Sequence, residues 1–224
     1  GRARHGDNAD MREGDTLTLN VTALDESGDG VAQHAGHAVH VVAAFPGERV
    51  SARVDYVSKR APMSHAHLLE VLTPHPARTK AACPQHPSRG GRCTGCTLMP
   101  FAVDAQRSAL RQYLRDDLGL HVSERSSSAA LEGDRSSGYR YSSKRVAFGG
   151  PGRLGSFIRG SHHVAYMDGC IVEHPSIGRA VAAVERAVQA LNVGAYDERT
   201  GRGLLRYVWF KTDGERVLCT LIMS

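Results

Sequence analysis

Regular alternation of apolar and polar residues from Gly14 to Arg60 is the feature that most limits what this chain can fold into. A period of two puts alternate side chains on opposite faces of a β-strand. Turn-forming residues interrupt it at Ser27–Gly30, Ala35–Gly36 and Pro46–Gly47, so the strands must be short and close together. The pattern predicts a small antiparallel β-barrel over residues 12–73. Its expected core positions are Leu17, Leu19, Val21, Val39, Val41, Val50, Ala52 and Val54.

Two helices are predicted by apolar residues that recur at three- and four-residue steps. The first lies within residues 101–118, where Gly119 is placed to end it, and the second follows Pro175. We expect both apolar stripes to pack in a core. The stripes consist of Val103, Leu110, Tyr113, Leu114 and Leu118, and of Ile177, Val181, Val184, Val188 and Leu191.

Strands are predicted around these helices. Residues 139–148 and 154–172 have strand patterns, and Asp213-Gly214 between two apolar runs is typical of a β-hairpin. The run from Gly149 to Gly152 fits a turn between strands. Residues 78–224 therefore predict an α+β domain that follows the barrel.

Charge is unevenly distributed between the two predicted domains. Residues 1–73 contain 7 Lys and Arg against 10 Asp and Glu, whereas residues 74–224 contain 21 against 13. Eighteen of these 21 cations are Arg, which suits forked contacts to phosphate, although a genome rich in Arg codons would give the same excess. We expect the basic half to bind RNA, with Arg140, Lys144 and Arg145 as contacts beside Tyr139 and Tyr141.

From the composition we expect a soluble globular protein. The 224 residues include 41% hydrophobic residues, enough for a buried core, and no stretch approaches the roughly 18 apolar residues of a membrane helix. The opening residues lack the apolar core that a signal peptide has. We therefore expect a cytoplasmic, monomeric protein without a membrane partner. Five cysteines in a reducing compartment favour metal binding over disulfides.

Cysteine spacing indicates a metal site. Cys93 and Cys96 are two residues apart, which lets one turn direct both sulfurs at a single ion. The remaining ligands have two interpretations. His86 and Cys83 would complete a local zinc site, whereas Cys83 and the distant Cys170 would complete four thiolates around an iron–sulfur cluster. Spacing alone does not choose between them.

Several segments resemble, in order, the bacterial 23S rRNA (uracil-5-)-methyltransferases. "LDESGDGVAQHAGHAVHVVAAFPGERVSARV" is similar to their TRAM domain, an OB-like barrel. "GYRYSSKRVAFG", "LGSFIRGSHHVAYMDGC" and "GLLRYVWFK" are similar to strands of their central domain. The spacing Cys-x9-Cys-x2-Cys-x73-Cys resembles the family's cluster ligands, with a wider first gap. The resemblance implies a 4Fe-4S cluster on Cys83, Cys93, Cys96 and Cys170, with 23S rRNA as partner.

The resemblance also implies a reaction. Family members transfer the methyl group of S-adenosylmethionine to C5 of uracil, using a cysteine nucleophile in a Rossmann-like domain. Neither a cofactor loop nor a nucleophile segment is found in this sequence, and Cys219 has the pattern of a core thiol. We therefore predict the RNA-recognition and iron–sulfur portion of such an enzyme, incomplete at its C-terminus and inactive alone, with S-adenosylmethionine bound only by an absent domain. No catalytic residue is assigned. The alternative is a zinc-bound RNA-binding module without enzymatic activity.

Overall fold

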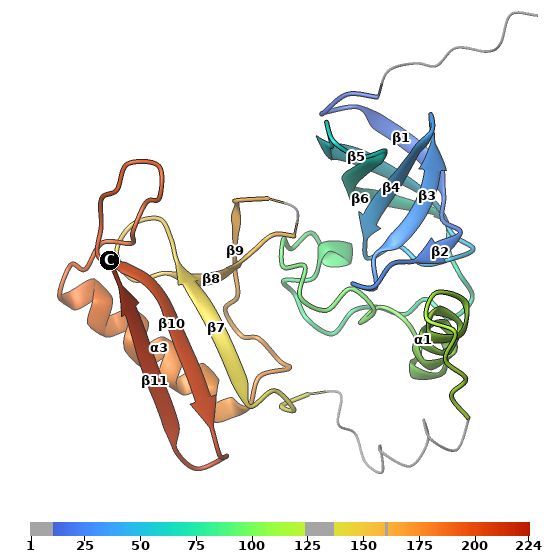
Figure 1. Cartoon of the computed structure of the whole chain (residues 1–224). Coiled ribbons are helices and arrows are strands. Elements are labelled where there is room, and N and C mark those ends of the chain that lie inside the picture. The colour runs from blue at the N-terminus through green and yellow to red at the C-terminus, as the bar shows by residue number, and fades with distance from the viewer. Residues whose placement is uncertain (1–10, 124–136, 160) are drawn as a thin grey trace, which may run out of the picture. The chain divides into compact units, whose positions relative to one another are not determined.

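The computed structural model describes residues 11–123, 137–159 and 161–224. Figure 1 shows a mixed fold with two β-sheets and few helices, so the predicted mixture of helices and strands is confirmed. The chain divides into two compact units. The first comprises Gly1–Ala82 and Cys96–Val122, and the second comprises Cys83–Gly95 and Ser123–Ser224.

The first unit contains a six-stranded sheet with the order β1-β5-β6-β4-β3-β2. Its strands are β1 (Thr16–Asn20), β2 (Ala23–Leu24), β3 (Gly30–His34), β4 (His37–Val42), β5 (Arg49–Val57) and β6 (Met63–Thr73). Neighbouring strands are antiparallel except β4 and β6, which run parallel. The three predicted turns lie between β2 and β3, between β3 and β4, and between β4 and β5.

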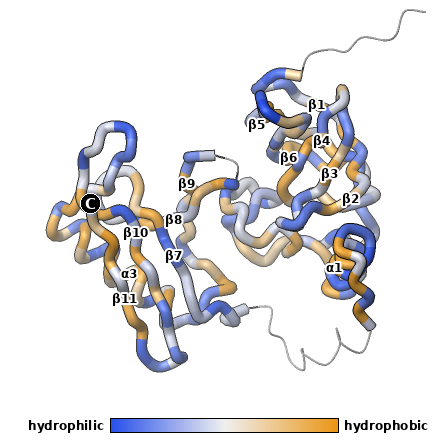
Figure 2. The backbone as a smooth tube through the Cα atoms, in the orientation of Figure 1, coloured by the Kyte–Doolittle hydropathy of each residue, from blue (hydrophilic) through white to orange (hydrophobic). Residues whose placement is uncertain are grey.

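One hydrophobic core underlies this sheet, and Figure 2 shows its strands alternating between hydrophobic and hydrophilic residues. The predicted core is confirmed, except that Leu17 is only partly buried and Val54, although buried, lies outside the main cluster. The cluster also includes residues that the alternation did not single out. Its buried members are Leu19, Val21, Ala32, Val39, Val41, Ala44, Val50, Ala52 and Ala66.

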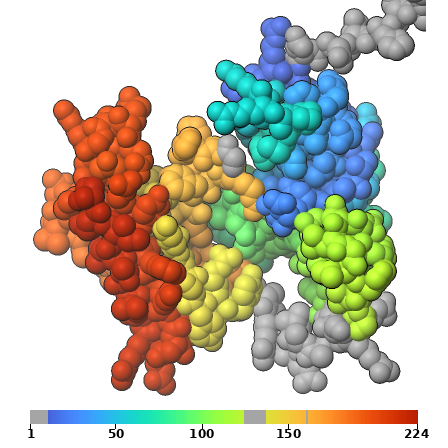
Figure 3. All heavy atoms as spheres, in the orientation of Figure 1, coloured from blue at the N-terminus to red at the C-terminus, as the bar shows by residue number. Residues whose placement is uncertain are grey.

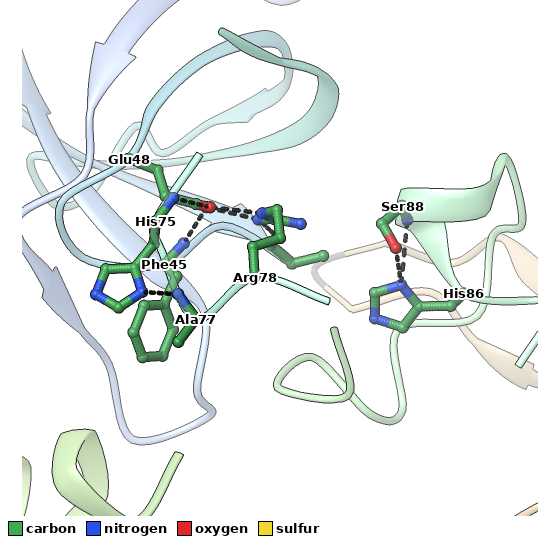
Figure 4. A network of polar contacts seen from close by, with 8 residues as sticks. Phe45, Glu48, His75, Ala77, Arg78, His86 and Ser88 are labelled. Carbon is green, nitrogen blue, oxygen red and sulfur yellow. Dashed lines mark hydrogen bonds and ion pairs between the residues drawn. The ribbon is translucent and has the colours of Figure 1, made fainter. Parts of the chain in front are cut away.

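A buried ion pair ties the loop before β5 to the segment that follows β6 (Figure 4). Glu48 is 1% exposed, and its carboxylate accepts hydrogen bonds from the backbone N–H groups of Phe45 at 2.9 Å and His75 at 3.0 Å. The guanidinium of Arg78 donates to both carboxylate oxygens at 2.5 Å and to the carbonyl oxygen of Ala43 at 2.8 Å. Four donors therefore satisfy one buried carboxylate, as a buried charge requires.

Helix α1 (Val103–Asp116) forms where it was predicted, but the prediction that its apolar face is buried is wrong. No residue of α1 is buried, and Val103 and Leu110 are 49% and 48% exposed. Helical periodicity shows that a helix has an apolar side, but another element must pack on that side to bury it. Figure 2 shows hydrophobic and hydrophilic residues on this helix.

The second unit contains a five-stranded antiparallel sheet with the order β11-β10-β7-β8-β9. Its strands are β7 (Ser142–Ala147), β8 (Leu154–Phe157), β9 (Val164–Tyr166), β10 (Leu205–Thr212) and β11 (Val217–Met223). The predicted hairpin is confirmed, because β10 and β11 pair on either side of Asp213 and Gly214. The predicted turn at Gly149–Gly152 also lies between strands β7 and β8.

Helix α3 (Pro175–Ala190) packs on one face of this sheet. Ile177, Val181 and Val188 are buried there with Val208 and Phe210 of β10. The predicted stripe is therefore confirmed over most of the helix, whereas Leu191 beyond its end is 75% exposed. Among the residues that the structure describes, no helix combines the length and apolar character needed to cross a bilayer.

Candidate RNA-binding and metal-ligand residues

The segment between Cys83 and Cys93 is a loop that closes on itself. The backbone N–H of Cys93 donates to the carbonyl oxygen of Gln85 at 2.9 Å. A Cβ at Gly91 would lie 2.1 Å from that same oxygen, closer than any real contact, so the loop needs glycine at this position. The wide spacing between these two cysteines is therefore accommodated by a folded loop within the second unit.

His86, the zinc ligand of the alternative interpretation, lies inside this loop and is 2% exposed. Its Nδ1 accepts a hydrogen bond from the backbone N–H of Ser88 at 3.1 Å and lies 2.8 Å from the Ser88 hydroxyl (Figure 4). The ring thereby caps the short 3-10 helix η1 (Pro87–Arg89). In this arrangement Nδ1 of the ring is engaged by Ser88.

Cys170 lines a cavity of about 200 Å³ within the second unit, next to the start of α3. Burial raises the pKa of the Cys170 thiol, and the negative charge of Glu173 raises it further by a smaller amount. None of the five cysteines, all of which lie in the described ranges, forms a disulfide. Cys219 packs partly buried against the core and burial raises its pKa, so the prediction of a core thiol is confirmed.

The four predicted ligands are not gathered by either unit alone. Cys83, Cys93 and Cys170 belong to the second unit and Cys96 to the first. Over the described ranges, no group of three or more His, Cys, Asp and Glu side chains is placed to hold a metal ion. The predicted iron–sulfur site therefore rests on the cysteine spacing and on the resemblance of the sequence motifs.

The three predicted RNA contacts fall in different environments. Arg145 is 2% exposed and donates to Glu173 at 2.6 Å, while Ser143 donates to the other carboxylate oxygen at 2.5 Å. A guanidinium buried in such a pair presents no surface to RNA, so Arg145 is better assigned a structural role. Arg140 is partly exposed, and its backbone pairs with the segment before α3. Lys144 is exposed.

Sequence reasoning missed the neighbours of Lys144 on the sheet. Its ammonium lies 4.3 Å from the centroid of the Tyr207 ring, and Lys211 lies 4.1 Å from that of Trp209. The alternation in "RYVWFKT" was the available signal, because it places Tyr207, Trp209 and Lys211 of β10 on one face.

Comparison with known proteins finds no family model that matches the chain. An uncharacterized RNA methyltransferase of Geobacter sulfurreducens is 39% identical over 204 residues, which cover 88% of this chain and 40% of that protein. The 23S rRNA (uracil(1939)-C(5))-methyltransferase RlmD of Halomonas elongata is 33% identical over 177 residues, 77% of this chain and 35% of that protein. The chain thus spans less than half the length of these relatives.

A solved structure shares the fold. The Pyrococcus abyssi tRNA (uracil-54, C5)-methyltransferase in complex with S-adenosyl-L-homocysteine matches with a TM-score of 0.65 at 20% identity, covering 92% of this chain and 46% of that chain. The similarity to RNA methyltransferases expected from the sequence motifs is therefore confirmed.

The prediction of a chain that lacks catalytic function is contradicted by these comparisons. It was inferred from two missing motifs, a cofactor loop and a nucleophile segment. The aligned relatives are instead named as RNA methyltransferases, and 92% of this chain matches the fold of 46% of a methyltransferase solved with S-adenosyl-L-homocysteine. The absence of a short motif is weaker evidence than an alignment over most of the chain, so the prediction of inactivity is withdrawn.

Proposed function

We propose that this chain functions in S-adenosylmethionine-dependent methylation of uracil at C5 in RNA, with 23S rRNA as the substrate. The observation that carries the proposal is the 39% identity to an RNA methyltransferase over 88% of the chain. Similarity to RlmD supplies the choice of 23S rRNA. S-adenosylmethionine is proposed because the structural neighbour was solved with S-adenosyl-L-homocysteine.

The first unit fits the role of an OB-like RNA-binding barrel, the TRAM domain expected from the sequence. Strands β1 and β2 occupy opposite ends of the sheet order, although only Val21 and Thr22 separate them in the chain. One nearly continuous segment therefore pairs with β5 at one end and β3 at the other. This pairing supports a sheet that curves until its edges meet, which is how a barrel removes its free edges.

Loss of the gene that encodes this chain is the test of the proposed reaction. We expect 23S rRNA from cells without the gene to lack one 5-methyluridine, measured by nuclease digestion and mass spectrometry, and a plasmid copy to restore it. Loss of 5-methyluridine from tRNA would keep the reaction and change the substrate. Unchanged 5-methyluridine in both rRNA and tRNA would contradict the proposal.

The cysteine set is proposed separately, as ligands of a 4Fe-4S cluster, because it is supported only by the cysteine spacing and by the resemblance of the sequence motifs. Iron, acid-labile sulfide and zinc can be measured in protein purified without oxygen. A cluster on Cys83, Cys93, Cys96 and Cys170 predicts iron and sulfide that are lost in a Cys170→Ser variant. Zinc that is retained in Cys170→Ser and lost in a His86→Gln variant would support the local site instead.

A further inference from the structure

The face of the second sheet that α3 does not cover has a distinct composition. In β10, Val208 and Phe210 are fully buried against the core that α3 completes, so the residues between and beside them must point to the opposite, outer face. The strand register aligns three rows of three residues on this outer face. The rows are Ser142, Lys211 and Leu218; Lys144, Trp209 and Thr220; and Val146, Tyr207 and Ile222.

Aromatic rings and ammonium groups alternate at the centre of this outer face. Lys144 lies over the ring of Tyr207, the diagonal neighbour of its partner Trp209, and Lys211 lies over the ring of Trp209. The indole N–H of Trp209 donates to the hydroxyl of Ser142 at 2.9 Å. That hydrogen bond helps fix the plane of the indole, which leaves the ring oriented before any ligand arrives.

The outer face is also accessible and positively charged. Trp209 is 40% exposed and Leu218 is 64% exposed, and β10 and β11 form much of the visible surface of the second unit (Figure 3). Lys144 and Lys211 are the only two lysines in the sequence of this unit. Neither has a carboxylate partner among the residues that the structure describes.

We propose that the outer face binds single-stranded RNA, with bases stacked on Trp209 and Tyr207 and phosphates contacted by Lys144 and Lys211. Residues at positions i and i+2 of a strand are about 6.8 Å apart, so the rings of Tyr207 and Trp209 are separate platforms for neighbouring bases. Open sheet faces that display aromatic rings bind RNA in this way. The inference deepens the proposed function and rests on it, because it names the part of the chain that holds the RNA.

The existing contacts between lysines and rings do not prevent stacking. An exposed cation–π contact is weaker than the stacking of a base on an aromatic ring. A base can therefore displace an ammonium from its ring, and the flexible lysine stem lets the ammonium move to the adjacent phosphate. A purely apolar partner would have to desolvate both lysines without offering them a negative charge, which favours RNA over a protein surface.

Trp209 is the only tryptophan in the chain, so its fluorescence reports directly on this face. The 224-residue chain is titrated with a fluorescein-labelled oligouridylate, and binding is measured by anisotropy. The same titration with unlabelled oligomer measures tryptophan quenching. We expect quenching that follows the anisotropy curve. Trp209→Leu should weaken binding about 5- to 150-fold, the range for loss of one stacked base, whereas Trp209→Phe should stay within about threefold.

Charge variants test the lysines without removing the rings. Replacing Lys144 and Lys211 together by Gln should reduce the slope of log affinity against log salt by about 1.4, or about 0.7 for each phosphate that is no longer neutralised. Arg186→Gln, on the exposed side of α3, is the matched control and should leave that slope unchanged. Circular dichroism of each variant confirms folding, and the lysine variants keep the test informative if a Trp209 variant fails to fold.

The possible results separate this inference from the proposed function. RNA binding by anisotropy without tryptophan quenching, and with equal affinity in Trp209→Leu, would overturn the outer face as the site while leaving RNA recognition intact. Binding of a protein ligand in place of RNA would be detected as quenching by polypeptide but not by oligouridylate, and would also overturn it. No anisotropy change under any salt condition would contradict RNA recognition by the chain itself.

Discussion

Replacing Glu48 by Ala should destabilise the first unit far more than any surface substitution. The change removes the carboxylate that accepts from Arg78 and leaves that guanidinium, which is mostly buried, without its counter-charge. It also leaves the backbone N–H groups of Phe45 and His75 without their acceptor. Removing one partner of a buried ion pair costs about 3–5 kcal/mol in the free energy of unfolding.

Urea unfolding of the full chain measures this cost. With an m-value of about 2 kcal/mol per M, the midpoint for the first unit should fall by roughly 1.5–2.5 M. Far-UV circular dichroism reports on both units, whereas the fluorescence of Trp209 reports on the second unit alone. We expect the Glu48→Ala change to appear in circular dichroism and not in tryptophan fluorescence.

Asp116→Ala is the matched control, because Asp116 pairs with Arg115 in the same unit with both side chains about half exposed. Such a pair contributes about 0–1 kcal/mol, so its midpoint should hardly move. If Glu48→Ala lowered the midpoint no more than Asp116→Ala, the buried carboxylate would not hold the two segments together. A Glu48→Gln variant, which keeps the shape and removes the charge, should lie between the two.

Three further predictions concern core packing, pH and a turn. Phe210→Ala should lower the unfolding free energy of the second unit by about 3–5 kcal/mol, measured by tryptophan fluorescence in urea, whereas Leu218→Ala, at an exposed position, should change it by less than about 0.5 kcal/mol. The hydrogen bond to Asp25 raises the pKa of His40, so stabilisation by protonated His40 is complete below its unfolded pKa of about 6.5 and is lost as pH rises through the higher folded pKa. Burial would raise the pKa of Asp25, but hydrogen bonds from His40 and backbone N–H groups lower it, so the stabilisation by ionised Asp25 is lost as pH falls through that lowered pKa. His40→Gln should flatten the pH dependence of the free energy of unfolding, measured from urea midpoints by circular dichroism. Gly203→Ala should destabilise the second unit in the same fluorescence assay, because the φ angle is +98° and a Cβ would lie 2.0 Å from a backbone oxygen.

Local structure was predictable where the signal is contained in a few neighbouring residues. Asp213-Gly214 marks the β10–β11 hairpin, and Gly214 adopts a φ of +107° that suits glycine. Pro175 opens α3, as a missing N–H at the first helical turn allows. These features depend on backbone geometry that the residues impose themselves, so the sequence predicts them without knowledge of the rest of the fold.

Burial was less predictable, because it depends on partners distant in sequence. Arg145 is expected at a surface from its charge, but Glu173, 28 residues away, accepts its hydrogen bond inside the unit. Arg78 is in a Pro-rich segment that has the pattern of a linker, yet it completes the network around Glu48, 30 residues before it. In both cases the sequence shows a charge and not the carboxylate that balances it.

The candidate RNA site was only partly predictable for a related reason. Lys144 and Arg145 are adjacent in sequence and were grouped as one patch, but adjacent residues of a strand point to opposite faces. Lys144 is instead a neighbour of Tyr207 and Trp209, more than 60 residues further along the chain. The register between β7 and β10 decides this neighbourhood, and a single sequence gives no direct measure of register.

Alternation along β7 also gives the two faces of the second sheet separate roles. Ser143 and Arg145 point inward and hold Glu173, three residues after Cys170, whereas Lys144 between them points outward. Because the inward residues carry the packing and the buried charges, substitutions on the outward face remove little buried surface. If the unfolding midpoint of an outer-face variant is unchanged, a weaker RNA affinity can therefore be attributed to the missing ring or ammonium itself. The midpoint is followed by Trp209 fluorescence, or by circular dichroism where Trp209 is replaced.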